Sequence, residues 1–230
     1  MLAFWQNWRR SWQYKMNRPW IRALAWFEFW LIDHGFLREL YNTPEQVVPG
    51  YWRSNQPSPG RIRRLAAQGF KTIVSLRGRG PDGVYLLESE AASAAGLHLL
   101  HHPFKSKRPP SPELVLALLD TFETVETPVL IHCKSGADRT GLAAALLFLD
   151  QTPPQLAAAA SQLSAKYLHS RTARTGILDA FVAAYGTAYA HSGIGLREWV
   201  EHEYDPAQLQ SSFKPSLGSS VLIDWVLRRE

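Results

Sequence analysis

The residues best suited to chemistry in this chain lie in one short segment, His-Cys-Lys-Ser-Gly-Ala-Asp-Arg-Thr-Gly at positions 132–141. Cys133 is the single cysteine, and Arg139 follows it six positions later. A thiolate is a strong nucleophile, and the planar guanidinium of arginine grips two phosphate oxygens at once. We therefore expect Cys133 to attack a phosphate monoester that Arg139 holds, giving a cysteinyl-phosphate that water then hydrolyses.

The sequence on either side of Cys133 predicts where this chemistry takes place. Residues 129–132 have the pattern of a short buried strand, and Thr140 begins a strongly helix-forming stretch, so residues 133–139 must form a strand-to-helix loop. The amides of such a loop and the positive end of the following helix dipole attract anions. Gly136 allows the tight turn. We expect this setting to favour the ionised thiol of Cys133, without any metal or other cofactor.

Other residues of the segment are expected to support Cys133 and Arg139. His132 would orient the loop by hydrogen bonding to its backbone, and Thr140 would donate its hydroxyl to the sulfur in the second step. The loop residues that would surround the phosphate are Lys134, Ser135, Gly136 and Ala137. The alternative, a Cys133 that merely fills the core, does not account for six positions sharing one mechanical purpose.

The segment resembles the signature of the protein tyrosine and dual-specificity phosphatase superfamily. Three further stretches resemble its bacterial atypical dual-specificity branch: Tyr-Trp-Arg-Ser-Asn-Gln-Pro at 51–57, Thr-Ile-Val-Ser-Leu-Arg-Gly at 72–78 and Lys-Tyr-Leu-His at 166–169. The resemblance covers roughly residues 48–189. It implies the compact dual-specificity phosphatase fold, with Cys133 as nucleophile, Arg139 as phosphate binder and Thr140 assisting hydrolysis.

The chain departs from that family at the general acid. The family usually supplies an aspartate from a mobile loop after the third strand, but residues 101–110 contain no carboxylate. Asp138 is the leading substitute, because an acid just before the loop arginine also occurs in myotubularin-like and some bacterial lipid phosphatases. A salt bridge or helix N-cap at Asp138 is the equally weighted alternative. Asp82 is a weaker candidate, since its surroundings are typical of a turn.

Basic residues around the loop bear on the substrate. Lys134 follows the nucleophile, and Lys105, Lys107 and Arg108 lie on the segment expected to face it. Such a mouth suits a substrate with more than one negative charge, and the tensin-like phosphatases also carry lysine after the catalytic cysteine. We therefore expect either a phosphorylated protein, as phosphotyrosine, or a lipid or inositol phosphate. The alternative is a lysine-rich loop that is only solvated.

The N-terminal region combines tryptophan with basic residues. Trp5, Trp8 and Trp12 would share one face of a helix, with arginine and lysine interleaved. A second helix is expected from Pro19 to about Asp33. The first helix has the character of an interfacial element on an anionic membrane. Docking of the helix onto the chain's own domain is the other interpretation, and it is slightly favoured.

The remaining pattern predicts the elements that would position the loop. Short β-branched runs alternate with helical stretches, which favours an α/β fold with a mostly parallel sheet of about four to five strands flanked by helices. The strands are expected at 51–54, 72–76, 97–101 and 129–132. The helices are expected at 59–68, 84–95, 112–125, 140–149, 153–167 and 176–189. We divide the chain into an N-terminal helical extension (1–47), a catalytic domain (48–190) and a C-terminal extension packed on it (191–230).

Composition excludes several classes of protein. One cysteine cannot form an intramolecular disulfide, which favours a reducing, cytoplasmic compartment. If the first helix is interfacial, the chain would attach peripherally to the inner face of the membrane. No run reaches the roughly 20 apolar residues that cross a bilayer. His98, His101 and His102 lack further ligands at metal-binding spacing, so no metal site is expected, and nothing indicates a nucleic-acid partner.

Two other functions compete with hydrolysis. A catalytically weak module that binds a phosphorylated partner through the intact loop is the main alternative, because residues 101–110 lack an acid. Sulfur transfer or arsenate reduction fits less well, because Cys133 has no second thiol to resolve a sulfur-bound intermediate.

Overall fold

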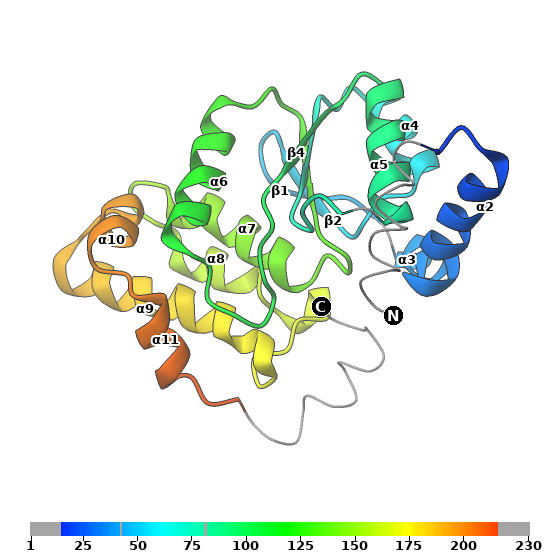
Figure 1. The fold of residues 1–230 in the computed structure, drawn as a ribbon. Helices are drawn as coiled ribbons and strands as arrows, with labels where there is room; N and C mark the ends of the chain where they lie inside the picture. The colour runs from blue at the N-terminus through cyan, green and yellow to red at the C-terminus, as the bar shows by residue number, and fades with distance from the viewer. Residues whose placement is uncertain (1–14, 42, 81, 216–230) are drawn as a thin grey trace.

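The computed structural model describes residues 15–41, 43–80 and 82–215, and they form an α/β structure around one five-stranded sheet (Figure 1). The strand order is β1-β2-β5-β3-β4, with β1 antiparallel to β2 and the other neighbours parallel. The strands are β1 (Glu45–Val48), β2 (Tyr51–Ser54), β3 (Thr72–Ser75), β4 (His98–His101) and β5 (Val129–His132). The fold class and the four expected strands are confirmed, while the edge strand β1 was not predicted.

Strand β5 lies at the centre of the sheet and leads into the cysteine loop. All four of its residues are buried, which explains its continuous apolar pattern. His132, its last residue, pairs in register with Ser54 of β2 and Ser75 of β3. The carboxyl ends of three parallel strands therefore meet at one edge, and Cys133 begins immediately beyond it.

Helices cover both faces of the sheet. On one face, α4 (Pro59–Ala67) and α5 (Gly83–Ala94) share a core with Ile73 and Leu130. On the other, α6 (Pro112–Thr124), α7 (Asp138–Leu149) and α9 (Ile177–Ser192) share a core with Val74 and Ile131. The side chains of consecutive strand residues thus pack into opposite cores, as their alternation along a strand requires. Figure 1 shows α4 and α5 on the side of the sheet away from α6 and α7.

The C-terminal helices pack against α6 and α9. Helix α10 (Leu196–His202) contributes Trp199, whose ring lies 5.4 Å from that of Phe181 and 5.0 Å from that of Tyr204, centroid to centroid. Helix α11 (Pro206–Ser212) follows, capped by Asp205. The division of the chain at 47/48 and 190/191 stays a prediction.

The helix expected at 153–167 is wrong in part. The structure has a short α8 (Leu156–Ser161), an extended Ser164 and a 3₁₀ turn, η3 (Ala165–Tyr167). After α8, the carbonyl oxygen of Gln162 accepts a hydrogen bond from the guanidinium of Arg53, on β2, at 2.9 Å. A second 3₁₀ turn, η4 (Arg174–Gly176), precedes α9.

The second N-terminal helix is confirmed. It consists of α2 (Pro19–Phe27) and a π-helical turn, η2 (Glu28–Ile32), and it is followed by α3 (Gly35–Tyr41). Gly83 allows α2 to lie close against α5, because a Cβ there would lie 2.5 Å from Cα of Ala25. The stretch with Trp5, Trp8 and Trp12 lies outside the described residues. No described helix is both long and apolar enough to span a membrane.

Candidate active site

Cys133 lies at the start of the predicted loop between β5 and α7, and its side chain is buried. Gly136, in the middle of the loop, has φ +75°. A Cβ at this position would lie 2.8 Å from the backbone nitrogen of Asn55 and from the carbonyl oxygen of Ser54. Only glycine therefore permits both this left-handed conformation and the close approach of the loop to the end of β2.

Arg53 fixes the loop from the side of β2. Its guanidinium donates to the carbonyl oxygen of Gly136 at 2.8 Å and to the backbone and side-chain oxygens of Gln162 at 2.9 and 2.8 Å. It also lies over the ring of Tyr167, 3.5 Å from the centroid. Burial lowers the pKa of Arg53 to about 10, so the side chain stays charged at neutral pH. Sequence reasoning missed this role, although Arg53 belongs to the stretch 51–57 that carried the resemblance.

His132 reaches both the loop and a buried acid. Its Nδ1 lies 3.2 Å from the carbonyl oxygen of Cys133, and its Nε2 lies 2.8 Å from Oε1 of Glu88 on α5. Burial pushes the pKa of Glu88 upward, but His132 and Arg77 outweigh it and hold that pKa below its ordinary value. An ionised Glu88 thus orients the His132 ring, an arrangement that suits the orienting role predicted for His132.

Asp138 lies in the first turn of α7 and contacts a histidine. Its Oδ1 lies 2.7 Å from Nδ1 of His169, whose Nε2 lies 2.6 Å from Oδ2 of Asp179. Burial opposes protonation of His169, but the two carboxylates dominate and raise its pKa. The structure therefore gives Asp138 the salt bridge of the alternative interpretation, and its use as an acid stays a prediction. Asp82 caps α5 by accepting from the backbone of Tyr85 at 2.8 Å.

Asp33, at the end of η2, is the main site residue that the sequence did not reveal. Its two oxygens lie 2.7 Å from Arg38, 2.8 and 3.1 Å from the two terminal nitrogens of Arg77, and 3.1 Å from Nζ of Lys134. Burial raises the pKa of Asp33, but the three cations overcome it and hold the pKa at about 2. Lys134 therefore has an acidic partner from the N-terminal region. Asp33 precedes Lys134 by about 100 residues in the sequence, so no local sequence pattern could connect the two.

The remaining predicted residues are distributed around the loop. Arg139 is buried in the first turn of α7, and the hydroxyl of Thr140 is buried without a hydrogen bond to any residue that the structure describes. Lys105 is exposed on the segment after β4. Arg108 lines a cavity with Lys107 further along that segment. No group of His, Cys, Asp and Glu in the described ranges could hold a metal ion.

A second cavity of about 330 Å³ adjoins the loop on the side of β1 and β2. Ser135 and Gly136 line it together with Tyr41, Arg53 and Tyr167. The volume lies at the lower end of the range for small-molecule sites. Ser135 thus contributes to a concave surface beside the loop, and its contact with a phosphate stays a prediction.

Solved structures of other proteins share the fold. TpbA of P. aeruginosa is 21% identical, with a TM-score of 0.52 over 67% of this chain and 93% of TpbA. A TpbA variant in complex with phosphotyrosine is 22% identical, with a TM-score of 0.50 over 66% and 93%. At these identities the likeness shows the fold alone.

A plant protein and a family model match the sequence itself. The probable NAD kinase 2, chloroplastic, of Oryza sativa subsp. japonica is 29% identical over 99 residues, which make up 42% of this chain but 10% of the rice protein. Residues 39–176 match the family described as DSP-PTPase phosphatase fused to NAD+ kinase. With more than half of its length in that match and a cysteine loop at the carboxyl edge of its sheet, the chain belongs to this family of dual-specificity-type phosphatases.

Proposed function

We propose that the chain hydrolyses phosphate monoesters through a cysteinyl-phosphate on Cys133. The observation that supports this proposal is the loop after β5, which begins with Cys133 and leads into Arg139 in the first turn of α7. Arg53 and Asp33 brace the same loop from two separate elements. Such preorganisation places donors where the charge of the transition state develops. Phosphate release by the intact chain, compared with a Cys133→Ser variant, tests the proposal.

The proposed reaction has two steps. Sγ of Cys133 forms a bond to phosphorus while the bond to the leaving oxygen breaks, and that oxygen takes a proton from an acid. Water then attacks phosphorus, gives a proton to the acid that was deprotonated in the first step, and displaces the thiolate as inorganic phosphate forms. Arg139 and the loop amides would hold the phosphate oxygens throughout, and the hydroxyl of Thr140, which has no partner among described residues, would stabilise the departing sulfur.

A substitution can identify the residue that donates the proton in the first step. We expect Asp138→Asn to slow hydrolysis of alkyl phosphates by about 10²-fold or more, and to change that of p-nitrophenyl phosphate little, because its leaving group needs no proton. Steady-state rates on both substrates measure this difference. Asp179→Asn, at the far side of His169, is the matched control. Equal losses on both substrates would assign Asp138 to loop architecture through its contact with His169.

For the substrate, we propose phosphotyrosine protein or a lipid or inositol phosphate. The TpbA structure with phosphotyrosine supports the first. The support for the second is the sequence, which puts Lys134 directly after the nucleophile, although the Lys134 ammonium is paired with Asp33. Phosphotyrosine peptides, phosphoinositides, phosphatidylglycerophosphate, lipid A and inositol polyphosphates, assayed side by side, distinguish these classes. The alternative function, a weak phosphate-binding module, rests on the missing carboxylate at 101–110 and predicts binding without release.

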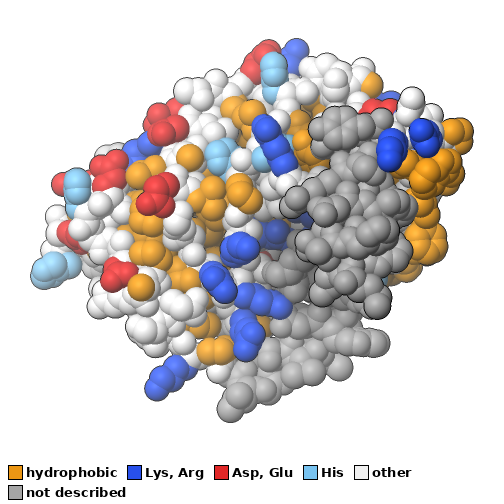
Figure 2. All heavy atoms as spheres, viewed as in Figure 1, with side chains coloured by type: hydrophobic (Ala, Val, Ile, Leu, Met, Phe, Trp, Pro, Cys, Tyr) orange, Lys and Arg blue, Asp and Glu red, His pale blue; other side chains and the backbone are white. Residues whose placement is uncertain are grey.

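We also propose that the N-terminal region attaches the chain peripherally to an anionic membrane at the cytoplasmic face. Of the nine exposed large apolar side chains among described residues, eight lie between Trp20 and Tyr41. Figure 2 shows apolar side chains gathered at the edge of the molecule where α2 and α3 lie, with basic side chains beside them. Concentrated exposed apolar surface of this kind marks interaction sites.

Vesicle binding tests this attachment. We expect the chain to sediment with vesicles that contain phosphatidylglycerol, and Leu31→Glu to weaken that binding about tenfold, because a charge would enter the lipid interface. Leu168→Glu is the matched control, since Leu168 is the one exposed large apolar side chain elsewhere in the described residues. Unaltered sedimentation of Leu31→Glu, or equal weakening by both variants, would contradict membrane docking by this face.

A further inference from the structure

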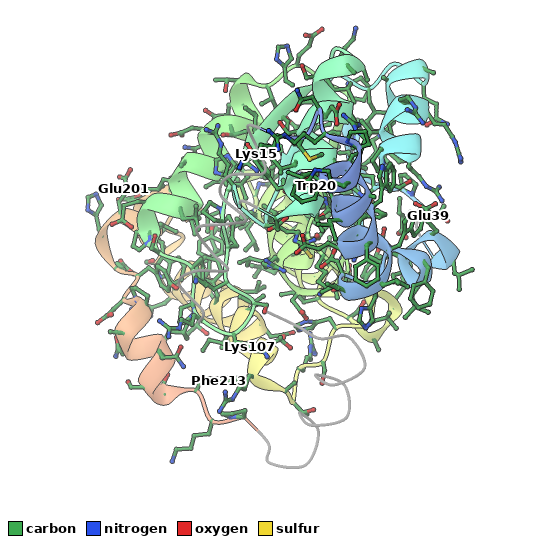
Figure 3. The ribbon with its side chains drawn as sticks, turned by 45° about the vertical axis from the view of Figure 1, so that its right-hand side comes forward. Lys15, Trp20, Glu39, Lys107, Glu201 and Phe213 are labelled. Atoms are coloured by element: carbon green, nitrogen blue, oxygen red, sulfur yellow. The ribbon has the colours of Figure 1, made fainter. Side chains whose placement is uncertain are left out.

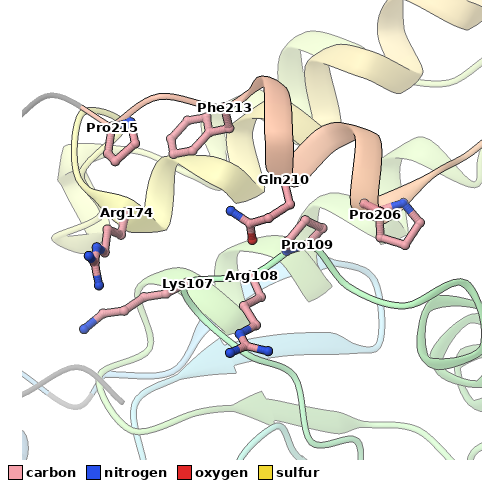
Figure 4. Close-up of a pocket in the computed structure, with 9 residues that line it drawn as sticks. Lys107, Arg108, Pro109, Arg174, Pro206, Gln210, Phe213 and Pro215 are labelled. Atoms are coloured by element: carbon pink, nitrogen blue, oxygen red, sulfur yellow. The ribbon is translucent and has the colours of Figure 1, made fainter.

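A cavity of about 810 Å³ lies between the segment after β4, the turn η4 and helix α11 (Figure 4). It is lined by Lys107, Arg108, Pro109, Arg174, Pro206, Ala207, Gln210, Phe213 and Pro215. Figure 3 places Lys107 and Phe213 near each other and well away from Trp20 on α2. This cavity is therefore separate from the apolar N-terminal face.

The charge of the lining is one-sided. Three of the nine lining residues are cationic and none is acidic. Arg108 and Arg174 are exposed, and neither is ion-paired within the described part of the chain. In Figure 4 the side chains of Lys107 and Arg174 extend toward the same side of the cavity. Unpaired guanidinium groups that share one concave surface favour anions, because each can donate two hydrogen bonds to one phosphate.

Both walls of the cavity are tied to the cysteine loop. Phe104 and Cys133 belong to the same buried cluster, and Lys107 follows Phe104 by three residues. On the other wall, His169 contacts Asp138 of α7, and Arg174 follows His169 by five residues. Five residues span at most about 18 Å. The Cα atom of Arg174 therefore lies within about 18 Å of the Cα atom of His169, whose side chain contacts Asp138 in the first turn of α7.

The size and the apolar wall limit the ligand. About 810 Å³ is the volume of a site for a small molecule. Phe213, Pro206 and Pro215 add apolar surface to the lining. Helix α11 follows residues 39–176, the part of the chain that matches the family model. The wall that α11 forms is therefore built by the C-terminal part of the chain, outside that match.

We propose that this cavity is a second anion-binding site, which takes a non-reacting phosphate of a substrate that carries more than one phosphate group. Lys107, Arg108 and Arg174 hold that phosphate, while Cys133 attacks another phosphate of the same molecule. The inference rests on the proposed phosphatase function and narrows its substrate to multiply phosphorylated small molecules or headgroups. It adds a source of specificity remote from the nucleophile.

Calorimetric binding to the full chain with Cys133→Ser tests the cavity without any need for turnover. The probes are inositol hexakisphosphate, a water-soluble diphosphorylated phosphoinositide and free phosphotyrosine, which carries a single phosphate. We expect Arg174→Gln to raise the dissociation constant of a multiply phosphorylated probe about tenfold and that of phosphotyrosine much less. Arg64→Gln, an exposed arginine on α4, is the matched control and is expected to change neither.

The outcomes separate the cavity from the catalytic proposal. A preferential loss for inositol hexakisphosphate alone identifies a free polyphosphate as the ligand, and a loss for the phosphoinositide alone identifies a headgroup. Equal effects of Arg174→Gln on all probes, or no effect on any, would overturn the inference. If the intact chain releases no phosphate from any probe but binding still depends on Arg174, the proposed hydrolysis fails and the second anion site stands.

Discussion

Cys133→Ser is expected to reduce phosphate release by at least about 10⁴-fold, because a neutral hydroxyl replaces the only thiol nucleophile. The substitution keeps the size of a side chain that is 2% exposed, so the fold should not change. Release of inorganic phosphate from p-nitrophenyl phosphate measures the loss. Trapping of a phosphorylated Cys133 in the intact chain, by rapid acid quench and mass spectrometry, would identify the intermediate directly.

A second substitution separates chemistry from phosphate binding. Arg139→Lys keeps the charge but removes the planar fork, and we expect a loss of about 10²- to 10³-fold. Thermal unfolding of both variants controls for damage to the structure.

Residual turnover within tenfold of the intact chain for Cys133→Ser would contradict the cysteinyl-phosphate. Absence of release by the intact chain, with phosphopeptide binding retained, would favour the binding-module alternative.

Much of the fold could be predicted from local sequence patterns, because the residues within and next to each central strand or helix specify that element. The run Val129–His132 is apolar on both faces and therefore could only be a buried strand. Ser58, Asp82 and Ser111 each accept a hydrogen bond from the backbone of the third residue after them, so the starts of α4, α5 and α6 are specified locally. The edge strand β1 carries no such signal, since Glu45–Val48 is only partly buried.

The nucleophile and its loop were predictable for the same reason, since the residues lie next to each other in the sequence. The groups that brace the loop were not. Arg53, Glu88 and His169 reach it from a strand and from two other segments, and their partners depend on how the elements pack. The basic mouth was predicted by placing Lys134 and the basic residues of the 101–110 segment on facing sides of one opening. The structure instead pairs Lys134 with Asp33 and places Arg108 on a separate cavity.

That pairing leads to the largest effect expected on stability. Asp33→Asn removes a carboxylate that contacts Arg38, Arg77 and Lys134, and leaves buried Arg38 without that counter-charge. We expect the free energy of unfolding to fall by about 3–5 kcal/mol, the usual result of removing one partner of a buried ion pair. Urea denaturation measures the change. Glu39→Gln, which breaks the more exposed contact with Arg61, is the matched control and should cost less than about 1 kcal/mol.

The pH dependence provides a second readout of Asp33. Its folded-state pKa of about 2 lies below the ordinary value of 3.8, so its stabilisation is present above about pH 4 and is lost as the pH falls toward 2. The difference in unfolding free energy between the intact chain and Asp33→Asn should therefore shrink across that interval. A difference that stays constant from pH 5 to pH 2 would contradict an ionised Asp33. A coupling near zero between Asp33→Asn and Lys134→Gln would show that the N-terminal region does not position the loop lysine.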